Sequence, residues 1–257
     1  MRLKVATRGD MLNSLILKIK RRETPLYDLL YRCLISARSC SVPSIRWIHL
    51  PLFYVDQSIR RTMRWLISGL WHVPLFKTRC EKVGKGLKLP DGIPYLIGGH
   101  LRLRLGDNVM ISRTTIGASK LFDDPVLEIG NNSGVGYGTV ISVTKRITIG
   151  DNVMIGANCM IMDSDDHPIN PALRLQRAPV QEEDVKPVTI GNNVWLGAYS
   201  TILKGVTIGE NSIIGAHSVI VRDVLPNCIY AGNPARPTVR DIDMPVVKRS
   251  SLDKMVE

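Results

Sequence analysis

Aromatic residues, cysteines and long hydrophobic runs are all scarce in this sequence. Phe, Trp and Tyr make up 5% of the 257 residues, and the five cysteines show no CxxC spacing. Scattered cysteines argue against a disulfide framework or a zinc site and favour a reducing compartment. The longest uncharged apolar run, residues 65–76, has 12 residues, whereas a membrane-spanning helix needs about 20. We expect neither such a helix nor a secretory signal, because charged and polar residues interrupt the apolar stretch at 12–19.

Acidic residues are also scarce, but only in the first third of the chain. Residues 1–80 contain 4 Asp and Glu against 15 Lys and Arg, whereas the remainder contains 19 of each, so the net charge of +11 belongs to this segment. Eight of the 14 aromatic residues lie there too, including Trp47, Trp65 and Trp71. This shift in composition predicts two pieces with a boundary near residues 79–86.

Beyond this boundary, aliphatic residues recur at a spacing of six. The longest series is Ile190, Leu196, Ile202, Ile208, Ile214 and Ile220, and glycine follows four of its members. Shorter series with the same spacing begin at Leu105, Ile129 and Ile149. A period of six fits neither the 3.6-residue period of a helix nor the two-residue alternation of a strand. Each unit must therefore be a short strand followed by a turn.

These units, such as residues 149–154 and 208–213, resemble the bacterial hexapeptide-repeat family over about residues 81–236. The resemblance implies a mainly β fold, a left-handed parallel β-helix in which three hexapeptides form one triangular coil. The aliphatic residue of each unit would point inward, and Gly, Asn or Asp would occupy corners that need a positive φ.

The chain is therefore expected to have three parts. They are a basic amphipathic helical extension at 1–80, a left-handed β-helix acyltransferase domain at 81–238 and a C-terminal tail at 239–257. Within the extension, residues 26–35 and 58–67 have apolar residues on one face and Arg on the other, which is typical of amphipathic helices.

The repeat is interrupted at three places. Residues 118–126 form a short insertion, the register slips by two between Ile147 and Ile149, and residues 167–188 form a long charged excursion. Interruptions in a repeat protein form loops on one face, which is often the binding face.

The long excursion begins at His167, inside the segment MetAspSerAspAspHisPro at 162–168. In the sugar and xenobiotic O-acetyltransferases of the family, the His of a similar HisPro segment is the catalytic base, and the resemblance implies this role for His167. A sugar hydroxyl needs a base because it attacks a thioester poorly until its proton is removed, and imidazole is a base near neutral pH. Asp165, or its neighbours Asp163 and Asp166, could orient the ring, as could a backbone carbonyl.

The resemblance also implies residues that bind the donor, acetyl-CoA. Trp195 lies in a segment similar to the one that lines the family's pantetheine slot, although a Trp at a subunit interface is an equal alternative. The backbone N–H of Gly197 or Ala198 would meet the oxyanion of the reaction. Arg222 and Arg236 match positions where the family's basic residues meet coenzyme A phosphate, and arginine suits phosphate because it donates two parallel hydrogen bonds.

We expect an O-acetyltransferase that acts on a carbohydrate, a sugar hydroxyl of a cell-surface polysaccharide or its lipid-linked precursor. The alternatives are acetylation of a soluble nucleotide sugar or antibiotic, and a structural solenoid without catalysis. A carbonic anhydrase on this fold would need converging His ligands, and His100, His167 and His217 lack the spacing, so we expect no metal.

The expected assembly is a homotrimer, because flat aliphatic walls need covering. We expect a cytoplasmic protein, with residues 1–80 either contacting an anionic membrane at its inner face or capping the open end of the solenoid. No nucleic-acid-binding motif is recognisable, so nucleic acid is not an expected partner.

Overall fold

The structure, a computed structural model, describes residues 8–39 and 43–239. The chain divides into two compact units, Met1–Ser58 and Ile59–Glu257. The helices before the solenoid are α1 (Arg8–Arg21), α2 (Pro25–Ser39), α3 (Arg46–Ile67), the π-helical turn η1 (Ser68–His72) and α4 (Val73–Lys77). The helices predicted at 26–35 and 58–67 are confirmed within α2 and α3. The predicted tail lies, beyond Val239, outside the described residues.

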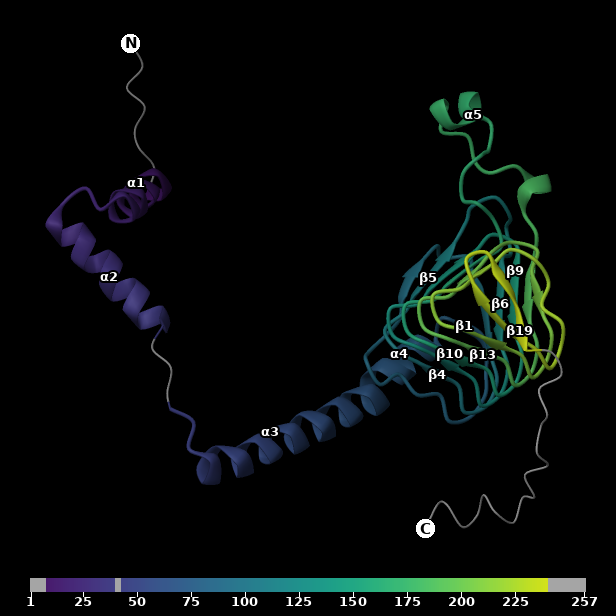
Figure 1. Ribbon diagram of the computed structural model, residues 1–257, viewed down its shortest axis with the longest axis horizontal. Coiled ribbons are helices and arrows are strands. Elements are labelled where there is room, and N and C mark those ends of the chain that lie inside the picture. Colours follow the sequence, from purple (N-terminus) through teal and green to yellow (C-terminus); the bar gives the residue numbers. More distant parts are fainter. Residues whose placement is uncertain (1–7, 40–42, 240–257) are drawn as a thin grey trace. The chain divides into compact units, whose positions relative to one another are not determined.

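The second unit contains a parallel β-helix, as the repeat predicted (Figure 1). Sheet A consists of β1 (Cys80–Val83), β3 (Arg102–Leu105), β6 (Val126–Ile129), β9 (Arg146–Ile149), β12 (Val188–Ile190) and β15 (Thr207–Ile208). Sheet B consists of β4 (Met110–Ile111), β7 (Gly134–Val135), β10 (Met154–Ile155), β13 (Trp195–Leu196), β16 (Ile213–Ile214), β18 (Ile229–Gly232) and β19 (Ala235–Val239). Sheet C consists of β2 (Tyr95–Ile97), β5 (Thr115–Ala118), β8 (Val140–Val143), β11 (Met160–Met162), β14 (Thr201–Ile202) and β17 (Val219–Ile220). All paired strands are parallel except β18 and β19.

The aliphatic residues of the six-residue period fill the interior. Ile190, Ile202 and Ile214 are each at most 1% exposed, and each pairs in register with its equivalents on the neighbouring coils. Burial of such side chains contributes about 1.5–3 kcal/mol each to folding. The six-residue period is therefore the length of one side of a coil, a short strand with its turn, and the residues that stack on each other, such as Ile190 and Ile208, come one whole coil apart.

All three interruptions of the repeat fall at the corner where the chain passes from sheet C to sheet A. They follow β5, β8 and β11. The expected slip between Ile147 and Ile149 is wrong in its placement, because both residues lie on β9 and both are buried. The extra residues are instead Thr144 and Lys145 at the corner before β9. The longest insertion carries α5 (Pro171–Leu175) and the 3-10 turn η2 (Glu182–Asp184), and Figure 1 shows it projecting from the coils.

The corner between sheets A and B is held by a row of asparagines. Asn108, Asn132, Asn152, Asn193 and Asn211 all have φ between +54° and +59°. Their side-chain amides donate from one coil to the next at 2.8–3.2 Å. Asparagine suits this position because its short polar side chain tolerates the left-handed region. This confirms the predicted use of Asn at corners.

The outer faces of the sheets differ in polarity. On sheet A, the outward row in register is Arg104, Glu128, Thr148, Thr189 and Thr207. On sheet B, the corresponding row is Met110, Gly134, Met154, Trp195 and Ile213. We call this second row the sheet B stripe. Its Met154 is 60% exposed and its Trp195 is 48% exposed, so sheet A is suited to water and sheet B is not.

Residues before the strands contribute to the solenoid's core. Phe76 of α4 is 1% exposed and belongs to the core cluster, and Val73 packs against it. The core therefore extends into the helical segment, and the second compact unit, which begins at Ile59 within α3, includes α4. In the described residues, no helix is both long and apolar enough to cross a membrane.

Candidate active site

Asp163 fixes the point at which the long insertion leaves the coil. Its carboxylate accepts hydrogen bonds from the backbone N–H groups of Thr144, Lys145 and Arg146 at 2.6, 2.7 and 2.7 Å. Its own carbonyl accepts from the N–H of Lys186, where the insertion returns, at 2.9 Å. The side chain is fully buried, and burial raises the pKa of the Asp163 carboxyl against the opposing effect of its N–H donors. Asp163 thus ties both ends of the insertion to the preceding coil.

The next residues form a hydrogen-bonded turn. The Ser164 and Thr144 hydroxyls lie 2.7 Å apart, and Asp166 Oδ1 accepts from Ser142 Oγ at 3.0 Å. Asp166 has φ +59°, in the left-handed region that Asp and Asn tolerate better than most residues. This turn determines where the following residue, His167, projects.

Asp165, the predicted orienting residue, is engaged elsewhere. Its Oδ2 accepts from Lys204 Nζ at 2.6 Å, and the same ammonium group lies 3.8 Å from Asp184 Oδ1. Lys204, which sequence reasoning missed, belongs to the coil after the insertion and is 20% exposed. It bridges the start and the end of the insertion. The available signal was a lysine two residues after the inward Ile202, but its partner Asp165 lies 39 positions away in the chain.

His167 is exposed at the mouth of the insertion. Its backbone N–H donates to the Asp165 carbonyl at 2.7 Å, and Pro168 after it is buried. Within residues 8–39 and 43–239, no hydrogen bond or ion pair engages the His167 ring. An imidazole free of partners on a fixed backbone can accept a proton from a bound molecule.

The two predicted oxyanion donors, the N–H groups of Gly197 and Ala198, differ in whether they are already hydrogen-bonded. The N–H of Gly197 donates to the Ile214 carbonyl at 2.7 Å, and a Cβ at Gly197 would lie 2.5 Å from Ala216 N, so coil stacking requires glycine there. The carbonyl of Ala198 accepts from the His217 N–H at 2.9 Å, but the Ala198 N–H has no acceptor in the described part of the chain.

The matching N–H group at another corner shows why the Ala198 N–H is unpaired. Between sheets A and B, the Asp151 N–H donates to Asn192 Oδ1 on the next coil. The residue above Ala198 is Ala216, whose methyl group accepts nothing. The corner between sheets B and C therefore offers a backbone donor that can serve an oxyanion.

Two aromatic rings lie beside this donor. Tyr199 and His217 stack with ring centroids 4.7 Å apart and planes 6° from parallel. Both have positive φ values, +61° and +57°, at a position where two neighbouring coils have Gly138 and Asn158. His217 is exposed, as expected for a corner residue, but its partner Tyr199 was not predicted.

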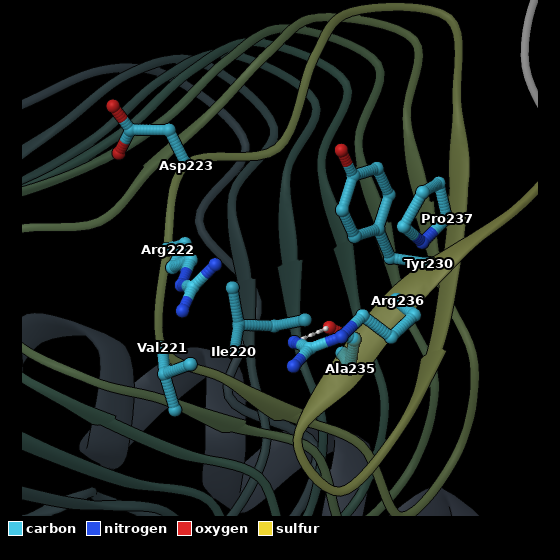
Figure 2. A pocket seen from close by; sticks show the side chains of 8 residues that line it. All are labelled: Ile220, Val221, Arg222, Asp223, Tyr230, Ala235, Arg236 and Pro237. Atoms are coloured by element: carbon cyan, nitrogen blue, oxygen red, sulfur yellow. Dashed lines mark hydrogen bonds between the residues drawn. The ribbon is translucent and has the colours of Figure 1, made fainter.

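Arg222 and Arg236 line one pocket at the C-terminal end of the solenoid (Figure 2). Its volume is about 170 Å³, and Tyr230 and Ala235 are among its other lining residues. Arg236 donates to the Ala235 carbonyl at 3.1 Å, and Asp223 accepts from the Thr207 N–H. Neither arginine forms an ion pair within the described residues, so both can meet an anion.

A single chain does not bring all of these residues together. His167 belongs to the corner between sheets C and A, Trp195 to sheet B, and Ala198 to the corner between sheets B and C. Across the residues that the structure describes, no group of three His, Cys, Asp or Glu side chains could hold a metal ion.

Two family models match the chain within the solenoid. Residues 187–222 match the bacterial transferase hexapeptide, and residues 146–164 match the hexapeptide repeat of succinyl-transferase. Among curated proteins, the polysialic acid O-acetyltransferase of Neisseria meningitidis is 33% identical over 59% of this chain and 70% of its own length. The galactoside O-acetyltransferase of Escherichia coli (strain K12) is 38% identical over 50% of this chain, which spans 64% of that relative.

A solved structure has the same fold. The chain resembles a mutant of the N-acyltransferase AntD from Bacillus cereus, in complex with dTDP-4-amino-4,6-dideoxyglucose and coenzyme A, with a TM-score of 0.56 and 20% identity. The match covers 72% of this chain and 96% of that one.

Proposed function

Because this chain belongs to the bacterial hexapeptide-repeat transferases, we propose that it transfers an acetyl group from acetyl-CoA to a sugar hydroxyl. The proposed acceptor is a cell-surface polysaccharide or its lipid-linked precursor. The observation that carries the proposal is the exposed, unpartnered His167 ring on a hydrogen-bonded turn, at the position where the sequence resemblance implies the base. Relatives named as sugar O-acetyltransferases support the choice of acceptor.

In the proposed reaction, His167 removes the proton of the acceptor hydroxyl while that oxygen attacks the thioester carbon. The Ala198 N–H donates to the oxyanion that forms. When the tetrahedral intermediate collapses, the carbon–sulfur bond breaks, and the imidazolium returns its proton to the thiolate. The products are an O-acetyl sugar and coenzyme A. Arg222 and Arg236 hold phosphate groups of the donor.

The direct test is release of free thiol from acetyl-CoA in the presence of different acceptors. We expect release with a lipid-linked saccharide or a polysaccharide, together with acetate esters on the recovered sugar. Thiol release with a nucleotide sugar alone would contradict the choice of acceptor. No release with any carbohydrate would contradict the proposed activity.

The proposed active form is a trimer. His167 and Ala198 lie at different corners of one chain, so a second copy must bring one corner to the other. The sheet B stripe supplies an apolar surface that such a copy would cover.

We expect light scattering to give about three times the chain mass of 28.6 kDa. Met154→Glu should break the assembly and abolish transfer, because it places a charge in the sheet B stripe. The matched control is Thr189→Glu, on the polar outer face of sheet A, which should remain trimeric. An active monomer would contradict the trimer.

Residues 1–80 are proposed to contact an anionic membrane surface at the inner face. In the described part of α3, no residue is buried, and Trp47 and Trp65 are 78% and 74% exposed. Basic helices with exposed tryptophans lie in the headgroup region, where each Lys or Arg adds about 1 kcal/mol.

The full chain is expected to sediment with anionic vesicles at low salt and less at high salt. A chain beginning at Ile59 should sediment less, because it lacks the first compact unit. Truncation at Ile59 retains Phe76, whereas truncation after the extension would remove this core residue. Equal sedimentation of both chains would show that the first unit does not contribute.

A further inference from the structure

Two adjoining cavities lie where the end of α3 and the η1 turn meet the first coils. Their volumes are about 550 and 320 Å³, and both are lined by Arg64, Pro90 and Asp91. All their lining residues belong to the second compact unit. These cavities are separate from the pocket of Arg222 and Arg236, so the proposed donor site does not account for them.

The cavities carry an excess of positive charge. Arg61 and Lys88 line the larger one, Arg113 lines the smaller one, and Arg64 lines both. Asp91 is the acidic residue among the lining residues. Arg64 Nε donates to the Arg60 carbonyl at 3.4 Å, but no ion pair in the described ranges neutralises the lining cations. Arginine forks of this kind suit the oxygens of a phosphate group.

His72, which lines the smaller cavity, carries an unsatisfied buried atom. Within the described residues, His72 Nδ1 is buried and has no hydrogen-bond partner. It lies on the last residue of the π-helical η1 turn, and such turns are frequent at functional sites. Ser68 Oγ fastens this turn to the coil by donating to the Leu89 carbonyl at 2.8 Å. Buried polar atoms without partners call for a ligand or water, so this nitrogen has hydrogen-bonding capacity to offer.

The larger cavity is mainly apolar. Trp65, Leu87, Leu89 and Met110 line it together with Val73. Trp65 remains 74% exposed, and Trp71 on the η1 turn is 62% exposed. A simple anion would not need these side chains, whereas a molecule with both a phosphate and a hydrocarbon chain would contact both kinds of lining.

We infer that the two cavities bind a lipid phosphate. The phosphate head lies against Arg64, Arg113 and His72, and the hydrocarbon chain lies along Trp65 and Leu87. If the proposed function holds, on which this step rests, the lipid phosphate is the anchor of a lipid-linked acceptor.

The register of the coils connects this site with the proposed oxyanion donor. Tyr137, which lines the smaller cavity, lies at the corner between sheets B and C. Ala157 and Ala198 occupy the same position on the next two coils, as the hydrogen bonds of Asn158 and Tyr199 to Tyr137 and Ala157 show. Neighbouring strands are about 4.8 Å apart, so two coils span about 10 Å. Sugars attached to the phosphate can follow this corner to Ala198.

Calorimetric titration of the full chain without acetyl-CoA tests the site. The probes are farnesyl diphosphate, inorganic pyrophosphate and farnesol. We expect farnesyl diphosphate to bind at least tenfold more tightly than pyrophosphate or farnesol. Arg64→Ala and Arg113→Ala should each weaken the binding of farnesyl diphosphate at least tenfold. Trp65→Ala should weaken the binding of farnesyl diphosphate and leave that of pyrophosphate unchanged. The control is Lys85→Ala, which should bind farnesyl diphosphate as the parent does. Lys85 is an exposed cation on the same coil as Lys88, but it lines neither cavity.

The outcomes separate this site from the proposed activity. Binding by His167→Ala as tight as by the parent is expected, because that variant lacks the base and keeps the cavities. Equal affinity for pyrophosphate and farnesyl diphosphate would show that the hydrocarbon chain is not bound, and would overturn the proposed lipid site in favour of a site for simple anions. If the parent chain does not bind farnesyl diphosphate, the site itself is overturned. The same holds if both arginine variants bind it as tightly as the parent while their melting temperatures are unchanged.

Discussion

His167→Ala is expected to lower kcat about 10²- to 10⁴-fold, the usual contribution of a general base. The KM for acetyl-CoA should stay within a few fold, because Arg222 and Arg236, the residues proposed to hold the donor, line a separate pocket at the C-terminal end of the solenoid. The fold should also be unaffected, since the imidazole is exposed and makes no hydrogen bond in the described residues. Initial rates of thiol release at neutral pH measure the first effect, and thermal unfolding checks the second.

His100→Ala is the matched control for loss of an imidazole. His100 Nε2 lies 2.7 Å from the Ser119 carbonyl at another insertion of the same solenoid corner. This variant should retain transfer. The Asp165 carboxylate could either hold the insertion through its ion pair with Lys204 or orient the His167 ring, and Asp165→Asn separates these two roles. If it holds the insertion, the melting temperature should fall. If it orients the ring, kcat should fall at an unchanged melting temperature. A His167→Ala rate above a tenth of the parental rate would show that another group is the base.

Much of the solenoid could be predicted because its determinants are local. Each coil repeats the same choice of inward aliphatic residue and corner residue, so a spacing of six at Ile190, Leu196 and Ile202 already defines three walls. The placement of the slip at Ile147 was wrong because two inward residues on one strand look like a change of register. Side-chain burial on β9 distinguishes the two cases, and the sequence pattern does not.

The candidate site depends on contacts between distant residues, which local patterns do not contain. Lys204 reaches Asp165 only because the insertion returns to the coil beside its starting point. The cluster of Arg64 and Arg113 forms because a helix end meets the first coils, and nothing in the spacing of these arginines indicates it. The free N–H of Ala198 follows from Ala216 on the next coil, where other corners carry Asn. To predict these features, one must know which residues stack on each other in neighbouring coils, and the repeat alone does not give this.

Asp163→Ala is expected to be the most destabilising single substitution around the insertion. It removes a carboxylate that has no exposure to water and that accepts from three backbone N–H groups, those of Thr144, Lys145 and Arg146. Each unsatisfied buried donor costs about 1–3 kcal/mol, so the free energy of unfolding should fall by at least about 3 kcal/mol. For a chain of this size, each kcal/mol lowers the melting temperature by about 2–4 °C. Because His167 follows four residues later, kcat should fall as well.

Asp163→Asn should have a smaller effect than Asp163→Ala. With its amide oxygen at the Oδ2 position, asparagine still accepts from Lys145 and Arg146, but its NH₂ group then faces the Thr144 N–H. The matched control is Asp166→Asn, whose Oδ1 can still accept from Ser142 in an exposed turn, and its melting temperature should equal that of the parent. Thermal unfolding and initial rates of all three variants test the order. If Asp163→Ala unfolds at the parental temperature, the three hydrogen bonds do not hold the insertion, and the position of His167 must be set by the loop itself.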